Sequence, residues 1–201
     1  MRGATFCYDL GSPYAWLAAE RADAVLGRSG VAWTPVLLGG LFAATGRSSW
    51  ARTPARADGM AEVARRARDR GLPPPRWPDP WPNDGLRAMR AAVHAHALGH
   101  GRAFALAAFR VHFTEGRALS EEAGLALAAR RAGLDADDLL AATGAQEVKD
   151  RLRALTEAAL AAGVTGVPSV RVGDVVVWGD DRLEEAAALR GGDATARAPG
   201  P

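Results

Sequence analysis

A serine at a strand-to-helix junction is the first side chain in this sequence that is placed to do chemistry. Ser12 follows Gly11 and precedes Pro13. Proline suits the first helical position, where its missing N–H has no intrahelical partner, and serine is a preferred N-cap. The free N–H groups and the dipole of a helix N-terminus also favour an anion. From these residues alone, the simplest interpretation of Ser12 is a helix cap.

A proline near the end of the chain offers backbone groups rather than a side chain. Pro168 follows Val167 and cannot donate a hydrogen bond to a strand ladder, so it is expected at the start of a strand or at an edge. If the Val167–Pro168 bond is cis, the backbone N–H and C=O of Val167 turn outward. They could then pair with an extended peptide ligand, as in strand addition. The alternative is a trans proline that only opens a strand.

The elements that position Ser12 form a β-α-β unit. Residues 4–9 form a short apolar run that predicts a strand, and a helix over residues 13–26 is expected to stop at Gly27. Residues 31–38 predict a second strand, which Pro35 places near an edge or a bulge.

Helical patterns alone occupy the middle of the chain. They include a charged helix over residues 61–70, a helix capped by Asn83 or Asp84, and a helix capped by Ser120. Six prolines between residues 73 and 82 predict an extended connector, because proline is excluded from helix interiors and central strands. Trp77 and Trp81 lie in this connector, where they could line an aromatic pocket or simply pack the helices.

Strand patterns return after the helices. Residues 168–172 and 175–178 predict a hairpin joined by Gly173 and Asp174. A last helix follows, with Asp181 as the expected N-cap and Glu184 completing a capping box. The order predicts an α/β thioredoxin-like fold with a large all-helical insertion domain. We place the split thioredoxin-like domain at residues 1–40 and 164–190, the insertion at 41–163 and a disordered tail at 191–201.

Composition excludes several classes of protein. The 201 residues are 48% hydrophobic, with no run of eighteen apolar residues and no secretion signal, which predicts a cytoplasmic protein that does not span a membrane. A net charge of +2 without an aromatic-interleaved basic stripe argues against nucleic acid as a partner. The single cysteine, Cys7, excludes an internal disulfide, and its apolar surroundings predict a buried thiol.

Two other groups of residues have types that could form sites. Seven arginines between Arg47 and Arg70 could receive an anionic ligand or form a solvated helical face. His94, His96 and His100 have no carboxylate or cysteine near them in sequence, and a helix end is expected before His100. We therefore expect no metal site.

Five stretches together identify a family. The chain resembles the 2-hydroxychromene-2-carboxylate isomerases, which are relatives of the kappa-class glutathione transferases in the DsbA-like thioredoxin superfamily. The matching stretches are spread in order over most of the chain. They are residues 8–17 (Tyr-Asp-Leu-Gly-Ser-Pro-Tyr-Ala-Trp-Leu), 37–42 (Leu-Leu-Gly-Gly-Leu-Phe), 81–83 (Trp-Pro-Asn), 163–168 (Gly-Val-Thr-Gly-Val-Pro) and 178–183 (Trp-Gly-Asp-Asp-Arg-Leu).

The resemblance implies a glutathione-dependent cis–trans isomerase acting on an aromatic or chromene carboxylate. A redox thioredoxin would carry Cys-x-x-Cys where this chain has Ser12 and Ala15, so dithiol exchange is excluded. Ser12 is instead implied to be catalytic and to stabilise the glutathione thiolate by a hydrogen bond. The residues implied to bind glutathione are Ser12, Pro13, Tyr14, Arg47, Val167, Pro168, Asp180 and Asp181.

Each part of glutathione has an implied partner. Val167 would exchange backbone hydrogen bonds with the cysteinyl part, and Asp180 and Asp181 would meet the γ-glutamyl end at the start of the last helix. Family members often carry lysine soon after the Leu-Gly-Gly stretch, where this chain has Ala43 and then Arg47. Arg47 could bind a carboxylate bidentately in its place.

Two other functions and the oligomeric state remain open. A kappa-like transferase would conjugate glutathione to an electrophile, and a non-catalytic thioredoxin-fold module would bind peptides at the proline. The sequence does not decide whether the chain forms a homodimer.

Overall fold

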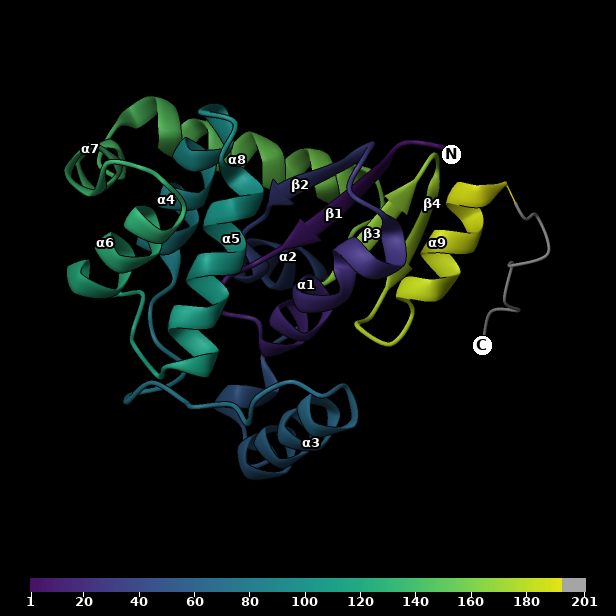
Figure 1. Cartoon of the computed structure of the whole chain (residues 1–201), viewed down its shortest axis with the longest axis horizontal. Helices are drawn as coiled ribbons and strands as arrows, with labels where there is room; N and C mark the ends of the chain where they lie inside the picture. The colour runs from purple at the N-terminus through teal and green to yellow at the C-terminus, as the bar shows by residue number, and fades with distance from the viewer. Residues whose placement is uncertain (193–201) are drawn as a thin grey trace.

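A four-stranded mixed sheet lies at the centre of the computed structural model, which describes residues 1–192 (Figure 1). The strand order is β2-β1-β3-β4, with β1 parallel to β2 and antiparallel to β3, and β3 antiparallel to β4. The strands are β1 (Ala4–Tyr8), β2 (Val31–Pro35), β3 (Ser169–Val172) and β4 (Val175–Trp178). The first and last thirds of the chain therefore complete one sheet.

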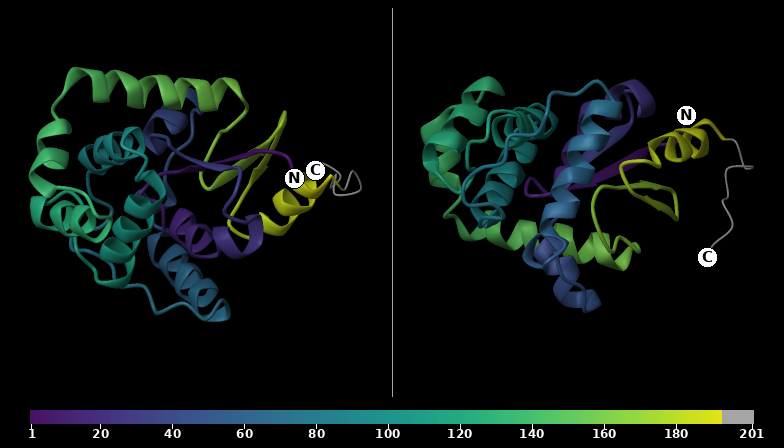
Figure 2. Two further views of the ribbon diagram at one scale, coloured as in Figure 1. Left: turned by 45° about the horizontal axis from the view of Figure 1, so that its top comes forward. Right: turned by 90° about the horizontal axis from the view of Figure 1, so that it is seen from below.

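Alternation along β1 explains how the sheet is covered on both faces. Phe6 and Tyr8 join the large core that contains Trp16, whereas Cys7 joins a smaller core with Ala159. Helices α1 (Pro13–Leu26) and α9 (Leu183–Gly191) pack side by side on the first face, and α8 (Gln146–Ala161) covers the opposite face (Figure 2).

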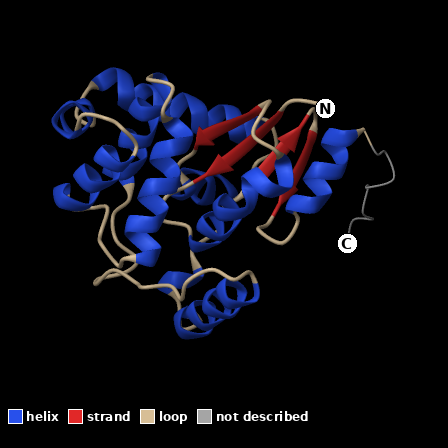
Figure 3. Ribbon diagram, in the orientation of Figure 1, coloured by secondary structure: helices blue, strands red, loops and turns tan. Residues whose placement is uncertain are grey.

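Within the described residues, the chain between β2 and β3 contains helices and loops but no strand (Figure 3). Helices α4 to α7 pack against one another beside β2, while α3 lies near the start of α1 (Figure 1). The elements are α2 (Leu38–Thr45), η1 (Trp50–Arg52), α3 (Arg56–Asp69), α4 (Leu86–Ala97), α5 (Gly101–Phe109), η2 (Arg110–Thr114), α6 (Glu122–Arg131) and α7 (Ala136–Ala142). The predicted α/β fold with a helical insertion is confirmed. The domain boundaries at 40/41 and 163/164 remain predictions.

Two predicted elements differ from the structure by several residues at one end. The second strand ends at Pro35 rather than at residue 38, and Leu38 instead begins α2. The backbone N–H groups of Leu37 and Leu38 donate to the side chains of Thr156 and Asp9, so tertiary contacts turn the chain out of the sheet. The charged helix begins at Arg56, five residues earlier than predicted, where it packs on Trp50 of η1.

Three predicted helix caps are wrong. The N-cap residue of α4 is Gly85 rather than Asn83 or Asp84, although Asp84 Oδ1 accepts from the N–H of Leu86 (2.9 Å). Glu121, not Ser120, is the N-cap residue of α6, because the chain turns at Ala118, whose carbonyl oxygen accepts from the N–H of Glu121 (3.4 Å). Arg182, not Asp181, is the N-cap residue of α9. The Asp181 carboxylate lies 3.7 Å from the Arg66 guanidinium, and Glu184 pairs with Arg21 instead of closing a capping box.

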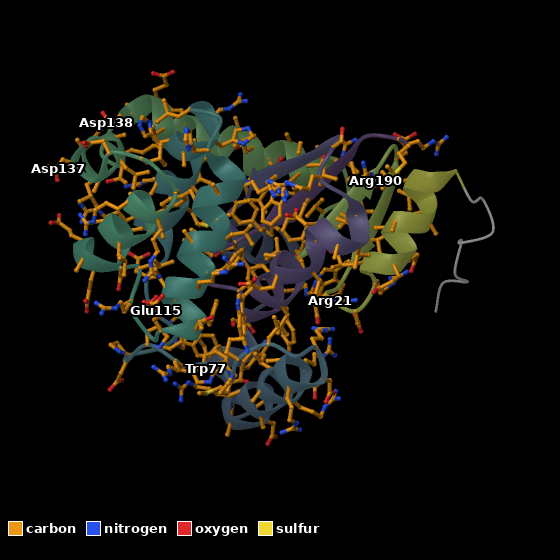
Figure 4. All side chains as sticks on the ribbon, viewed as in Figure 1. Arg21, Trp77, Glu115, Asp137, Asp138 and Arg190 are labelled. Atoms are coloured by element: carbon orange, nitrogen blue, oxygen red, sulfur yellow. The ribbon has the colours of Figure 1, made fainter. Side chains whose placement is uncertain are left out.

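The two ends of the described chain meet at one buried arginine. Arg190 near the end of α9 donates from Nε to the Arg2 carbonyl oxygen (3.0 Å) and from a guanidinium nitrogen to that of Ser29 (2.8 Å) (Figure 4). The predicted disordered tail starts at Gly191, which the structure places in α9. The rest of that prediction, residues 193–201, lies outside the described residues.

Candidate functional site

The start of α1 opens into a cavity of about 350 Å³, which we call the serine cavity. Its walls come from the α1 N-terminus, one side of α2, the segment before and within η1, the proline connector and the loop before β3. The lining residues that carry the argument are Ser12, Tyr14, Arg47, Trp50, Val167 and Trp178.

Ser12 is the N-cap of α1, as the residues predict, and its hydroxyl keeps a proton to donate. Its Oγ accepts a hydrogen bond from the N–H of Ala15 (3.2 Å). Among the described residues, neither the Ser12 hydroxyl proton nor the N–H of Tyr14 has an acceptor. Ser12 is only 4% exposed. The cavity therefore meets two donors at a positive helix end, which suits an anion.

A buried aspartate fixes the turn that carries Ser12. Asp9 accepts from the N–H of Gly11 (2.8 Å) with one carboxylate oxygen and from the N–H of Leu38 (2.8 Å) with the other. The turn before α1 is thereby tied to the start of α2. Burial raises the pKa of Asp9, and the two backbone hydrogen bonds oppose that rise.

The backbone before β3 forms the opposite wall of the serine cavity. The Val167–Pro168 peptide bond is cis. The Pro168 carbonyl accepts from the N–H of Gly179 (3.0 Å), and the Gly166 carbonyl accepts from the Ser169 hydroxyl (2.7 Å). Within residues 1–192, the N–H and C=O of Val167 have no hydrogen-bond partner. This pair of groups could receive an extended peptide.

A second cavity of about 350 Å³ adjoins the serine cavity and shares Tyr14, Val167 and Trp178 with it. We call it the Asp180 cavity. The Asp180 carboxylate is buried there and binds Arg66 of α3 (2.7 Å) and Arg70, which directly follows α3. Asp181, by contrast, has a side chain that is 57% exposed. Of the two predicted carboxylates, Asp181 is thus the one free to meet a ligand ammonium, while Asp180 positions two arginines.

Aromatic rings form part of the wall of the serine cavity. The Trp50 ring lies 5.6 Å from Trp81 and 6.1 Å from Tyr14, measured between centroids. Trp81 lines the cavity, whereas Trp77 does not line it. The Trp77 ring lies 4.4 Å from the Trp81 ring and packs on Phe113. Of the two alternatives for these tryptophans, Trp81 takes both roles and Trp77 only packs.

Arg47 provides a cation at the rim. Its guanidinium lies 4.6 Å from the centroid of the Trp178 ring and donates to the Thr165 carbonyl oxygen (3.5 Å). This position leaves the guanidinium in the lining of the cavity beside Trp178, where it could bind a ligand carboxylate.

All the residues predicted to bind glutathione line one of the two adjoining cavities. The sequence patterns did not single out Asp9, Trp50, Arg66 and Arg70. The arginine-rich stretch was the available signal for Arg66 and Arg70. Arg65 and Arg68 are exposed, as a solvated helical face predicts, whereas a role of this stretch in receiving an anionic ligand stays a prediction. Trp50 carried no spacing signal, since it reaches the cavity through the packing of η1 on α3.

The other residues that the sequence suggested line neither of the two cavities. Cys7 is buried as predicted, and burial raises its pKa to about 11, so its thiol stays protonated at neutral pH. Within the described part of the chain, no three His, Cys, Asp or Glu side chains gather as a metal site would require. Among residues 1–192, no helix is both long and apolar enough to cross a bilayer.

Comparison with known proteins identifies relatives over the whole fold. The family model for a DSBA-like thioredoxin domain matches residues 5–189. A solved 2-hydroxychromene-2-carboxylate isomerase superposes with a TM-score of 0.83 at 24% identity, covering 94% of both chains. A probable DsbA oxidoreductase from Streptomyces coelicolor superposes with a TM-score of 0.72 at 22% identity, covering 100% of this chain and 93% of the other. No curated protein sequence matches this chain.

Proposed function

Because the chain belongs to the family of DSBA-like thioredoxin domains, we propose that it is a cytoplasmic, glutathione-dependent enzyme of the 2-hydroxychromene-2-carboxylate isomerase type. Its substrate would be an aromatic or chromene carboxylate. The observation that carries the proposal is the serine hydroxyl at the α1 N-terminus, facing the unpaired backbone of Val167 across one cavity.

The chemistry of the site does not suit disulfide exchange, although several neighbours are named oxidoreductases. Ser12 and Ala15 lack sulfur, and the only cysteine is buried beside Val36 and Leu41. A hydroxyl donor and a free N–H at the start of a helix can stabilise a thiolate that belongs to a bound ligand rather than to the protein. The structure thus supports binding of a thiol better than use of the protein's own thiol.

The residues around the two cavities fit the parts of glutathione. The N–H and C=O of Val167 match the two backbone groups of a cysteinyl residue. Asp181 could receive the γ-glutamyl ammonium, and Arg66, held by Asp180, could meet the adjacent carboxylate. When bound there, glutathione would supply a nucleophilic thiolate that adds reversibly to an unsaturated carbon.

The protein's own part in the reaction is orientation and electrostatics. The Ser12 hydroxyl and the Tyr14 N–H hold negative charge at the helix start. Trp50 and Trp81 offer flat surfaces for an aromatic ring, and Arg47 offers a partner for its carboxylate. Burial raises the pKa of Tyr14, so its hydroxyl remains a hydrogen-bond donor at neutral pH.

An activity assay tests the proposal. The protein is mixed with 2-hydroxychromene-2-carboxylate, with and without reduced glutathione, and formation of the ring-opened trans isomer is followed. We expect turnover only with glutathione, and a loss of about 10²–10³-fold in kcat/KM in Ser12→Ala, the typical effect of removing one charge-stabilising donor.

The matched control is Ser48→Ala, which removes another hydroxyl from the lining of the same cavity. It should keep wild-type activity. Accumulation of a stable thioether would point instead to a kappa-like transferase. Absence of any glutathione-dependent product, with peptide binding retained, would point to a non-catalytic binding module.

A further inference from the structure

A separate cavity of about 500 Å³ lies between α2, α4 and α8, and we call it the α2–α4–α8 cavity. It shares no lining residue with the serine cavity. The two lie on different sides of α2, since Leu38 and Phe42 line the serine cavity and Gly40 and Ala44 line this one. Binding here would not compete directly for the site described above.

The floor of this cavity is aliphatic. Four leucines from three parts of the chain line it, and no aromatic side chain does. The leucines are Leu37, Leu86, Leu152 and Leu160. Such a surface suits a flexible hydrocarbon chain, in contrast to the tryptophans of the serine cavity, which suit flat rings.

The polar part of the lining is positively charged. Arg90 of α4 and Lys149 and Arg153 of α8 face the cavity, against the single carboxylate of Glu157. Among residues 1–192, neither Arg90 nor Lys149 forms an ion pair, whereas Arg66 and Arg70 both pair with Asp180. Arg153 makes only a long contact with Asp150 (3.7 Å). Two unpaired cations beside an apolar floor favour a ligand that has an anionic head group and an apolar tail.

We propose that the α2–α4–α8 cavity binds an aliphatic monocarboxylate. Its hydrocarbon chain would lie on the leucines, and its carboxylate would pair with Arg90 and Lys149 from the two facing helices. A neutral aliphatic molecule would fill the floor but leave the two cations without a counter-ion. An aromatic acid would find no ring to stack on.

Calorimetric titration with octanoate tests this site. We expect saturable binding of one octanoate per chain to the wild type, and weaker binding of 1-octanol, which has the same chain without the charge. The double variant Arg90→Gln, Lys149→Gln should bind octanoate about tenfold more weakly or worse, because both charge-assisted contacts are lost. Its unfolding curve establishes that it is folded.

The control Arg151→Gln removes an exposed cation from α8 outside the cavity lining and should leave octanoate affinity unchanged. Ser12→Ala should also leave it unchanged, so the site can be confirmed even if the proposed isomerase function fails.

Three results would overturn the site: no saturable octanoate binding, wild-type affinity in the double variant, or affinity that falls instead in Arg47→Gln, which would place octanoate in the serine cavity. A self-association that the double variant abolishes, without octanoate binding, would make this face a contact between two copies and also overturn it.

Discussion

At the scale of single residues, the hydroxyl of Ser12 is set apart by what surrounds it rather than by its type. Serine N-caps are common, and the hydrogen bond from Ala15 is the one a cap makes. What differs here is that Ser12 and Tyr14 line a cavity, and that neither the Ser12 hydroxyl proton nor the Tyr14 N–H has an acceptor among the described residues. Asp9 then holds this turn through Gly11 and Leu38, so the donors are fixed before a ligand arrives.

His112 carries a prediction about pH and stability. It is buried in η2, where its Nδ1 lies 3.1 Å from the Arg117 carbonyl oxygen and Nε2 has no partner among the described residues. Burial lowers its pKa from 6.5 to about 4. Since the folded pKa is depressed, the folded state prefers neutral imidazole. The stabilisation is present above pH 6.5 and is lost as pH falls towards 4.

We expect this histidine to remove roughly 3 kcal/mol of unfolding free energy between about pH 7 and pH 4. Urea unfolding of the wild type and of His112→Asn, which keeps a donor near the Nδ1 position, measures it. Subtracting the unfolding free energies of the two proteins at each pH removes the contribution of the other titrating groups. One of these is Asp9, whose raised pKa makes the folded state more stable as pH falls, opposite to the effect of His112. Parallel pH profiles for the two proteins would contradict the assignment.

At the scale of elements, the close approach of η1 and α3 places Trp50 in the wall of the serine cavity. Gly59 on α3 permits this approach, because a Cβ atom there would lie 2.3 Å from the Trp50 ring. The Trp50 ring in turn contacts both Tyr14 and Trp81. A small residue on one helix thus sets the position of a ring in the cavity.

Gly59→Ala should therefore destabilise the protein, by about 1–3 kcal/mol, as overpacking does. The matched control is Gly39→Ala in α2, where a Cβ atom meets nothing within 4 Å. It should be neutral or stabilising by up to about 1 kcal/mol, because alanine favours helix. Chemical unfolding of both variants, with near-UV circular dichroism to report the tryptophans, measures the contrast. Equal stabilities would show that Trp50 does not depend on Gly59.

The elements that the sequence predicts best are those with local signals. Ser12, Pro13 and Gly27 delimit α1 as predicted, and the Gly173–Asp174 turn joins β3 to β4. The end of β2 and the start of α9 depend instead on contacts between distant residues, such as Leu38 with Asp9 and Asp181 with Arg66. Local propensity carries no information about such contacts, so the predicted strand ran too long and the predicted cap was wrong.

At the scale of the whole molecule, one buried carboxylate joins the helical insertion to the C-terminal part of the sheet. Asp180 follows β4, while Arg66 on α3 and Arg70 directly after α3 lie more than a hundred residues earlier. The Arg66 guanidinium also lies over the Tyr14 ring at 5.4 Å, so the connection reaches α1. The walls of both cavities depend on this junction.

Asp180→Ala should destabilise the fold by about 3 kcal/mol, because it leaves two partly buried arginines without their shared partner. Asp69→Ala, which removes an exposed partner of Arg65 on the same helix, should cost under about 1 kcal/mol. Urea unfolding of the two variants measures the difference. A smaller effect for Asp180→Ala than for Asp69→Ala would contradict the proposed junction.

The arrangement of the whole molecule also determines which site residues can be predicted from the sequence. Ser12, Val167 and Asp181 lie in short stretches with recognisable neighbours, and the fold brings those stretches together. Arg66 and Trp50 lie in the insertion, where only the packing of α3 on the rest of the molecule gives them a role. The roles of Arg66 and Trp50 can therefore be recognised only in the folded structure.

The central claim is that the α1 N-terminus holds a glutathione thiolate, and calorimetric binding of reduced glutathione tests it most directly. The titration compares the wild type with Ser12→Ala from about pH 6 to about pH 9, in buffers of different ionisation enthalpy. Since a free thiol has a pKa of about 8.5, binding as thiolate should release a proton below that pH and tighten as pH rises. We predict such binding for the wild type and weaker binding with less proton release for Ser12→Ala. No saturable binding at millimolar glutathione, or binding without proton release in both proteins, would contradict the claim.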